Sequence, residues 1–189
     1  MFSAPPIPPE REQFPTVLVL ASGRGERFRA SGGQGHKLSA RLGDRSVLEH
    51  TLAAVRASGL PWHLEQQGLP GMGDSIAAAV RATPQSSGWL VLPADLPLVR
   101  AGTLQRVAEA LQHHRVVVPV CNGQRGHPVA FSAACFSDLV QLQGKGGAAA
   151  VVSAGEAMEL IVNDTGIWTD IDTLDDLQKA TMRWQAGLA

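Results

Sequence analysis

Short apolar runs alternate along this chain with longer stretches in which apolar residues recur every three or four positions. The short runs are rich in Val, Leu and Ile, which is typical of buried strands, whereas the longer period is typical of amphipathic helices. Strands that alternate with helices predict an α/β fold with a mostly parallel sheet and helices on both faces. The predicted strands are residues 16–21, 60–67, 89–92, 116–120, 129–131, 158–162 and 168–171, and the predicted helices are residues 47–58, 75–83, 104–113, 134–141, 148–154 and 173–185.

Capping residues mark the start of two of these helices. Ser46 is followed three positions later by Glu49, a spacing that predicts a capping box, and Gly59 follows the last turn of the same helix. Asp74 or Ser75 can cap the alanine-rich helix that comes next. Both helices are therefore predicted from local signals alone.

The length of the chain favours one domain, because 189 residues fall in the usual range for a single hydrophobic core. Five prolines stand within residues 1–15. Proline fixes φ and removes a backbone donor, so this segment is predicted to be a flexible or polyproline-like tail. The domain itself is then expected to span residues 16–189.

Charge and cysteine content narrow the classes of partner. The formal net charge is −1, from 16 basic and 17 acidic side chains, so no overall field attracts nucleic acid or an anionic membrane. No apolar run is long enough to cross a bilayer, and the start of the sequence lacks the features of a secretory leader. Two cysteines make a disulfide framework improbable, so we expect a cytoplasmic protein without nucleic-acid or membrane partners.

A glycine-rich loop, residues 21–28 (ASGRGERF), follows the first predicted strand. Glycines allow backbone N–H groups to turn inward and hold a phosphate chain, and Arg27 and Lys37 add positive charge beside it. A glycine-rich turn with solvated basic residues is the alternative interpretation. The loop lacks the Gly-Lys-Ser/Thr of a Walker loop and has Phe28 where a Rossmann loop needs its third glycine, so dinucleotide binding is disfavoured.

Two carboxylates and one histidine are further candidates. Asp95 follows an apolar strand, where it could hold a hard cation that bridges phosphates; otherwise it caps a turn between two prolines. Asp172 or Thr173 is most simply the N-cap of the terminal helix, which leaves Asp170 as the better second ligand. His127 lies between two strands and could position an anionic substrate, although a turn histidine is more often plain surface.

Taken together and in order, these segments resemble the molybdenum cofactor cytidylyltransferases, a family within the MobA-like NTP transferases. The similarity extends from about Thr16 to Leu177. It implies a single Rossmann-like three-layer domain that uses Mg²⁺. The motifs that carry it are LASGRGERF, the later Lys37-Leu38, GMGDSIAAAV, LPADLPLV, RGHPVAF and TDIDTLDDL.

The resemblance also implies roles for individual residues. Arg27 and Lys37 would contact the triphosphate, Asp95 and Asp170 would bind Mg²⁺, and His127 would face the acceptor. Gly73 and Ser75 would lie at the base or ribose. The nucleotide cradle would consist of Leu20, Ala21, Ser22, Gly23, Arg24 and Gly25.

Two segments depart from the pattern of this family. Only eleven residues separate Gly59 from Gly71, where the family fits a strand, a helix and another strand, so we expect the sheet to lack one edge strand–helix unit. Lys145 stands where relatives tend to have an acidic residue, which reverses a charge on the acceptor side. The acceptor is therefore open to differ.

The resemblance makes transfer of CMP from CTP to a phosphorylated acceptor the leading hypothesis, with molybdopterin as the acceptor and pyrophosphate as the other product. The sequence LASG is closer to the cytidylyl pattern than to the LAGG of the guanylyl branch, so use of GTP is the first alternative. A non-catalytic nucleotide-binding accessory protein is the second. Transient contact with a molybdoenzyme or its chaperone would follow from the first two.

Overall fold

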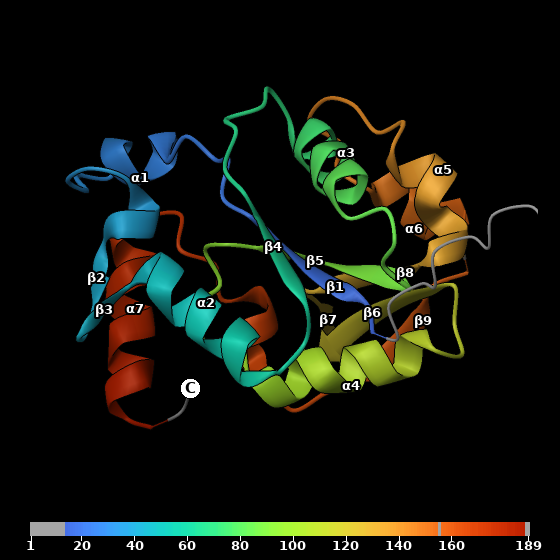
Figure 1. The fold of residues 1–189 in the computed structure, drawn as a ribbon. Helices are drawn as coiled ribbons and strands as arrows, with labels where there is room; N and C mark the ends of the chain where they lie inside the picture. Colours follow the sequence, from blue (N-terminus) through green and yellow to red (C-terminus); the bar gives the residue numbers. More distant parts are fainter. Residues whose placement is uncertain (1–13, 155, 188–189) are drawn as a thin grey trace, which may run out of the picture.

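A seven-stranded sheet runs through the middle of the domain (Figure 1). The structure is a computed structural model that describes residues 14–154 and 156–187; the tail predicted for residues 1–15 lies outside the described residues except for its last two positions. The strands of the sheet are β1 (Thr16–Leu20), β4 (Trp62–Glu65), β5 (Gly88–Pro93), β6 (Val116–Cys121), β7 (Gln124–Arg125), β8 (Val129–Ser132) and β9 (Met158–Ile161).

The order of the strands is β4-β1-β5-β8-β6-β7, with β9 paired to β6. Strand β1 is parallel to both β4 and β5, and β9 is parallel to β6. Strand β8 is antiparallel to β5 and to β6, so those two strands point the same way. The prediction of a mostly parallel sheet is therefore confirmed, and β8 and β7 are the strands that run against it.

Helices cover both faces of the sheet and divide the core into two layers (Figure 1). Val17 and Val19 of β1 point into the layer under α2 (Val47–Ala57) and α4 (Ala101–Leu111). Leu18 and Leu20 point into the opposite layer, under α3 (Met72–Ala82), α5 (Phe136–Leu139) and α6 (Ala149–Ala154). Alternate residues of the central strand thus bury against opposite layers, which explains why the run from 16 to 20 is apolar throughout.

A group of short elements flanks the sheet at the side of α2 (Figure 1). The terminal helix packs there on the hairpin, and the rings of Trp184 and His50 meet edge to face with centroids 5.7 Å apart. The members of this group are α1 (Glu26–Ala30), the 3₁₀ turn η1 (Lys37–Ser39), the hairpin of β2 (Arg41–Leu42) and β3 (Arg45–Ser46), and α7 (Leu174–Gln185).

Most helix starts follow the predicted caps. Ser46 and Glu49 form the capping box of α2, and Thr173 caps α7. The predicted cap of α3 at Asp74 or Ser75 is wrong, because that helix begins at Met72 with Gly71 as its N-cap. A Cβ on Gly71 would overlap the backbone of residue 144, so a long-range packing contact determines where this helix begins.

The predicted strand at residues 168–171 is also wrong. The chain there forms the 3₁₀ turn η3 (Thr165–Trp168) and then an extended segment outside the sheet. The side chain of Asp164 accepts a hydrogen bond from the backbone N–H of Gly166, which favours a tight turn over a strand. The region predicted as a helix at residues 134–141 is split into the turn η2 (Ala133–Cys135) and the short α5.

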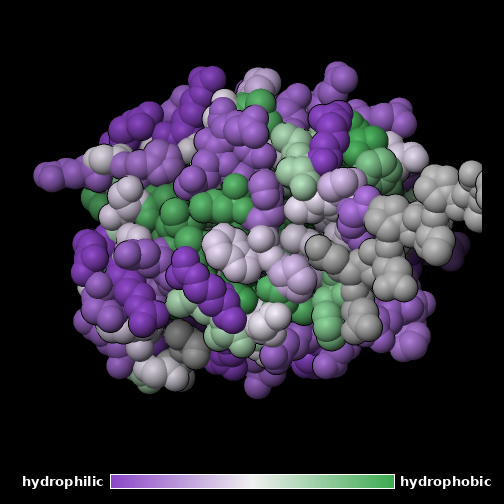
Figure 2. Space-filling model, viewed as in Figure 1, coloured by the Kyte–Doolittle hydropathy of each residue, from purple (hydrophilic) through white to green (hydrophobic). Residues whose placement is uncertain are grey.

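Strand β4 is the edge of the sheet, and it is the only regular element between α2 and α3 in this described stretch. This arrangement matches the expectation that the segment holds no helix. Trp62 on β4 is half exposed and lies under the guanidinium of Arg56. A band of hydrophobic surface crosses the middle of the face that β4 occupies, with hydrophilic residues above and below it (Figure 2). Among the described residues, no helix has the length and apolar character needed to cross a membrane.

One buried carboxylate links two distant segments. The Oδ2 atom of Asp164 accepts hydrogen bonds from the backbone N–H of Arg100, at 3.0 Å, and from the hydroxyl of Thr103, at 2.6 Å. Its Oδ1 atom accepts the bond from Gly166 at 2.9 Å. Asp164 therefore ties the start of α4 to the segment that leads into residues 168–172.

We predict that Asp164→Ala destabilises the domain by about 2–4 kcal/mol, because it leaves buried donors without their acceptor. Urea denaturation measures the free energy of unfolding. Asp175→Ala, at an exposed position of α7, is the control and should change stability by less than about 0.5 kcal/mol. Equal stability of the two variants would show that the Asp164 contacts do not anchor α4.

Candidate functional site

A cavity of about 1220 Å³ lies where the carboxyl ends of β1 and β5 meet the loops that follow them. Ligands of parallel α/β sheets bind at this edge. The predicted cradle Leu20–Gly25 lines the cavity, together with Arg27, Lys37, Asp95, His127 and Asp170. Residues from five separate parts of the sequence thus meet in one hollow.

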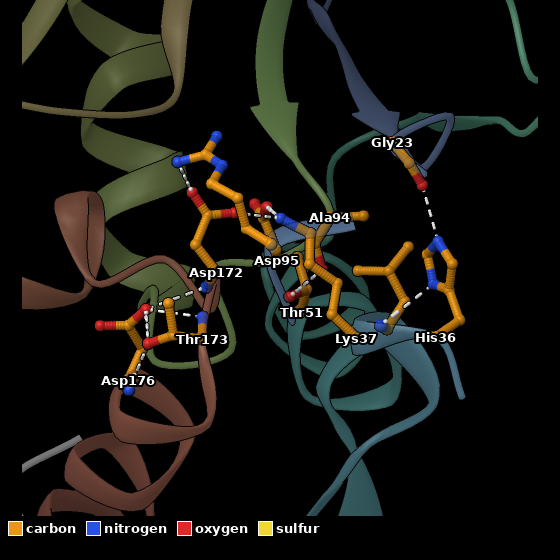
Figure 3. A network of polar contacts seen from close by, with 11 residues as sticks. Gly23, His36, Lys37, Thr51, Ala94, Asp95, Asp172, Thr173 and Asp176 are labelled. Carbon is orange, nitrogen blue, oxygen red and sulfur yellow. Dashed lines mark hydrogen bonds and ion pairs between the residues drawn. The ribbon is translucent and has the colours of Figure 1, made fainter. Parts of the chain in front are cut away.

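The glycine-rich loop is held in shape by residues outside it. Gly25 has φ of +64° and is the N-cap of α1, a conformation that favours glycine. The Nε2 atom of His36 lies 2.6 Å from the carbonyl oxygen of Gly23, and its Nδ1 accepts from the backbone N–H of Leu38 at 3.2 Å (Figure 3). Because Nδ1 accepts, Nε2 must carry the proton and donate to Gly23. His36 therefore clamps the loop to η1; its sequence offers no cap or motif that would have revealed this role.

Lys37 lies between two carboxylates at the floor of this loop (Figure 3). Its Nζ donates to Asp95 Oδ2 at 2.6 Å and to Asp172 Oδ1 at 2.5 Å. Only 12% of the Lys37 side chain is exposed. Burial acts to lower the pKa of Lys37, but the charges and hydrogen bonds of the two carboxylates outweigh it and raise the pKa above its ordinary value. Lys37 is thus a fixed positive charge.

The loop that carries Asp95 is anchored by backbone contacts. The hydroxyl of Thr51 on α2 donates to the carbonyl oxygen of Ala94 at 2.9 Å, and the N–H of Ala94 donates to Leu20 at 3.0 Å. The N–H of Ile171 donates to the carbonyl oxygen of Asp95 at 3.0 Å. These bonds hold the end of β5 between α2 and the segment that contains Asp170.

Two observations fit a divalent cation at these carboxylates. The Oδ1 atom of Asp95 is buried and has no hydrogen-bond partner among the described residues. The pKa of Asp170 is raised, first by burial and then by the charges of Asp95 and Asp172, so the three carboxylates crowd one another. Across residues 14–154 and 156–187, no group of three or more side chains could hold a metal ion alone. One or two carboxylates completed by substrate phosphates are the usual set for Mg²⁺.

His127 lies on the opposite wall of the cavity from the glycine loop in sequence, yet it is close to the same carboxylates. Its Nδ1 lies 3.4 Å from the carbonyl oxygen of Val91, and its backbone N–H donates to Ile167 at 2.7 Å. Burial lowers the pKa of His127, although Asp95 and Asp170 act in the opposite direction. His127 is therefore a neutral imidazole at pH 7.

Gly73 and Ser75 are buried on α3 and are not part of the cavity wall. The hydroxyl of Ser75 lies 2.6 Å from that of Ser22, so Ser75 supports the glycine loop from behind. The N–H of Gly73 donates to the carbonyl oxygen of Gly144 at 2.8 Å. The helix start is thereby joined to the loop that carries Lys145, which does line the cavity.

Asp172 is the site residue that the sequence interpretation assigned elsewhere. Capping logic offered Asp172 or Thr173 for α7, and the structure uses Thr173, with Asp176 completing the box. The carboxylate of Asp172 instead points into the cavity toward Lys37 and Arg27. A pattern of local spacing carries no signal for an ion pair that joins residues 135 positions apart.

Comparison with solved structures supports the fold. Rv0371c from Mycobacterium tuberculosis is 24% identical and superposes with a TM-score of 0.76 over 89% of this chain and 97% of that one. A second structure of Rv0371c, in complex with manganese, superposes with a TM-score of 0.70 at 23% identity, over 89% and 98%. The molybdopterin-guanine dinucleotide biosynthesis protein A from Archaeoglobus fulgidus gives 0.66 at 17% identity, over 91% and 98%.

Sequence comparison adds a curated relative and a family. The bifunctional protein GlmU from Alkalilimnicola ehrlichii is 33% identical over 122 residues, which are 52% of this chain. The aligned part is only 26% of GlmU, so the chain spans about a quarter of that relative. The model of the MobA-like NTP transferase domain matches residues 53–159, which include Asp95 and His127 but not the glycine loop or Asp170. Since the match extends over more than half of the sequence, the chain belongs to the family of MobA-like NTP transferase domains.

Proposed function

We propose that this protein is a Mg²⁺-dependent nucleotidyltransferase that transfers CMP from CTP to a phosphorylated small-molecule acceptor, with molybdopterin as the leading candidate. The observation that carries the proposal is the group formed by Lys37, Asp95 and Asp172 beside the glycine-rich loop. A fixed cation, a carboxylate with one unpartnered oxygen and a loop of backbone donors are the parts that a metal–triphosphate complex requires.

The chemistry is an in-line displacement at the α-phosphorus of CTP. An oxygen of the acceptor phosphate forms the new bond to phosphorus, the bond to the oxygen that bridges to the β-phosphorus breaks, and pyrophosphate leaves. Such a reaction depends on positioning and electrostatic stabilisation, and no protein nucleophile is needed. The bound metal ion would supply additional positive charge for the leaving group.

Residues of the chain would divide this work by their place in the cavity. Arg27 and Lys37 neutralise the triphosphate, and Asp95 with Asp170 holds the metal ion. Neutral His127 offers a hydrogen bond to the acceptor without adding charge. The open part of the cavity beyond His127 is lined by Arg125, Trp168 and Lys145, which gives room for a second, anionic substrate.

CTP is favoured over GTP by the resemblance of LASG to the cytidylyl pattern. The hydroxyl of Ser22 in this motif is engaged with Ser75, so it would act on base choice through the shape of the loop. GTP is the alternative donor, and it has support from the fold shared with the molybdopterin-guanine dinucleotide biosynthesis protein. An accessory protein that only binds nucleotide would have no use for the unpartnered oxygen of Asp95.

The proposal is tested by pyrophosphate release with each of the four NTPs, in the presence of Mg²⁺ and molybdopterin. We expect turnover with CTP and much slower turnover with GTP, ATP and UTP. Turnover with GTP alone would move the protein to the guanylyl branch. Nucleotide binding without any turnover would favour the accessory protein.

Asp95→Asn should preserve the fold and lower kcat/KM by about 10²–10³-fold, because the amide keeps the shape of the side chain but loses the charge that holds the metal ion. Activity is measured as a function of Mg²⁺ concentration. The midpoint should shift to higher Mg²⁺ in the variant. Wild-type activity at limiting Mg²⁺ would rule out Asp95 as a metal ligand.

His127→Ala should raise the KM of the acceptor or lower kcat, while the affinity for CTP measured without acceptor stays unchanged. Calorimetric CTP binding and steady-state kinetics separate the two effects. His114→Ala is the matched control, since His114 is exposed at the end of α4, away from the cavity wall. Loss of CTP binding in the His127 variant would place this residue on the nucleotide side.

A further inference from the structure

We propose that Asp172 is a positioning residue that holds Arg27 and Lys37 in the geometry needed to bind the triphosphate. The proposal rests on the proposed function, because it concerns the same cavity and the same ligand. It assigns a role to a carboxylate that we had first interpreted as a helix cap. The role is exerted through the two cations and not through the metal ion.

The two oxygens of Asp172 are each committed to a different cation. Oδ1 accepts from Lys37 at 2.5 Å, and Oδ2 lies 2.6 Å from the guanidinium of Arg27 (Figure 3). Asp95 differs, since its Oδ2 meets Lys37 but its Oδ1 is unpartnered within the described part of the chain. Asp95 therefore has a free oxygen for a metal ion, whereas Asp172 has both oxygens engaged.

Arg27 depends on Asp172 for its orientation. Its side chain is 79% exposed and comes from the five-residue helix α1, which offers little restraint. Among residues 14–154 and 156–187, Asp172 is the only acidic partner of Arg27. An exposed arginine without a partner samples many rotamers, and fixing it beforehand reduces the entropy that ligand binding would otherwise cost.

Lys37 shares its ammonium group between Asp95 and Asp172. A divalent cation at Asp95 would compete with Lys37 for the same carboxylate. The contact with Asp172 is the one that does not compete with the metal ion. Asp172 thus keeps Lys37 at the floor of the loop in both situations.

The backbone of Asp172 is itself held on both sides. Its N–H donates to the carboxylate of Asp176 at 3.2 Å, within the capping box of α7. On the other side, the N–H of Ile171 donates to the carbonyl oxygen of Asp95 at 3.0 Å. A carboxylate that starts from such a fixed point can orient mobile cations.

The sign of the effect on nucleotide affinity separates this role from simple electrostatics. A carboxylate near a triphosphate repels it, so removal of the charge alone should tighten NTP binding. If Asp172 positions Arg27 and Lys37, Asp172→Asn should weaken NTP binding instead. The two explanations therefore predict changes of opposite sign.

The experiment is calorimetric binding of CTP and GTP, with and without Mg²⁺, to the full chain and its variants. Asp172→Asn should weaken binding about tenfold, on the scale of one charged hydrogen bond. Asp175→Asn is the control, because it removes the same charge three positions away, where the carboxylate is exposed and paired with Lys179. It should change affinity by less than about twofold.

A double-mutant cycle tests whether Asp172 acts through the cations. In the background of Arg27→Ala with Lys37→Met, Asp172→Asn should no longer weaken binding, since the residues that it positions are gone. The Mg²⁺ concentration at half-maximal activity should also stay unchanged in Asp172→Asn. A higher Mg²⁺ requirement would identify Asp172 as a metal ligand and overturn the proposal.

Unchanged or tighter binding by Asp172→Asn overturns the proposal while the proposed function stands. Absence of binding of any NTP by the wild type overturns both. If Asp172→Asn does not fold, Asp172→Glu provides the same test at constant charge. The longer side chain displaces both cations and should weaken binding severalfold; unchanged affinity of a folded Asp172→Glu would contradict the proposal.

Discussion

The ammonium group of Lys37 lies between the carboxylates of Asp95 and Asp172, and the arrangement of the site depends on this contact. A charge that is almost fully removed from water needs partners, and loss of one partner is costly. The partners come from the end of β5 and from the start of α7, while Lys37 itself belongs to η1. The ion pairs therefore join segments that are far apart in the sequence.

The remaining structure keeps these segments in register. The parallel pairing of β1 with β5 brings the glycine loop beside Asp95, and Thr51 of α2 fixes the turn that follows β5. Asp164 anchors the segment before Asp170 to the start of α4. Trp184 packs α7 onto the hairpin side of the domain. The cavity is thus a consequence of how the sheet and its flanking helices end.

Local signals in the sequence predicted much of the fold. The boxes at Ser46 and Thr173 are visible because every partner lies within three residues. The start of α3 was misplaced because it is set by contact of Gly71 with a loop more than 70 positions away. The glycine loop and Asp95 were found through motif order, whereas the clamp formed by His36 and the ion pairs of Asp172 depend on tertiary contacts that no spacing reports.

Thermal unfolding of the wild type and of Lys37→Met, with CTP or GTP and with or without Mg²⁺, tests most directly whether this ion cluster is a triphosphate site. The account predicts that one of these nucleotides with Mg²⁺ stabilises the wild type by about 2.7 kcal/mol at a hundredfold excess over its Kd. Lys37→Met should retain a cooperative transition and lose most of this stabilisation. Equal stabilisation of both proteins, or none of the wild type by either nucleotide, would contradict the account.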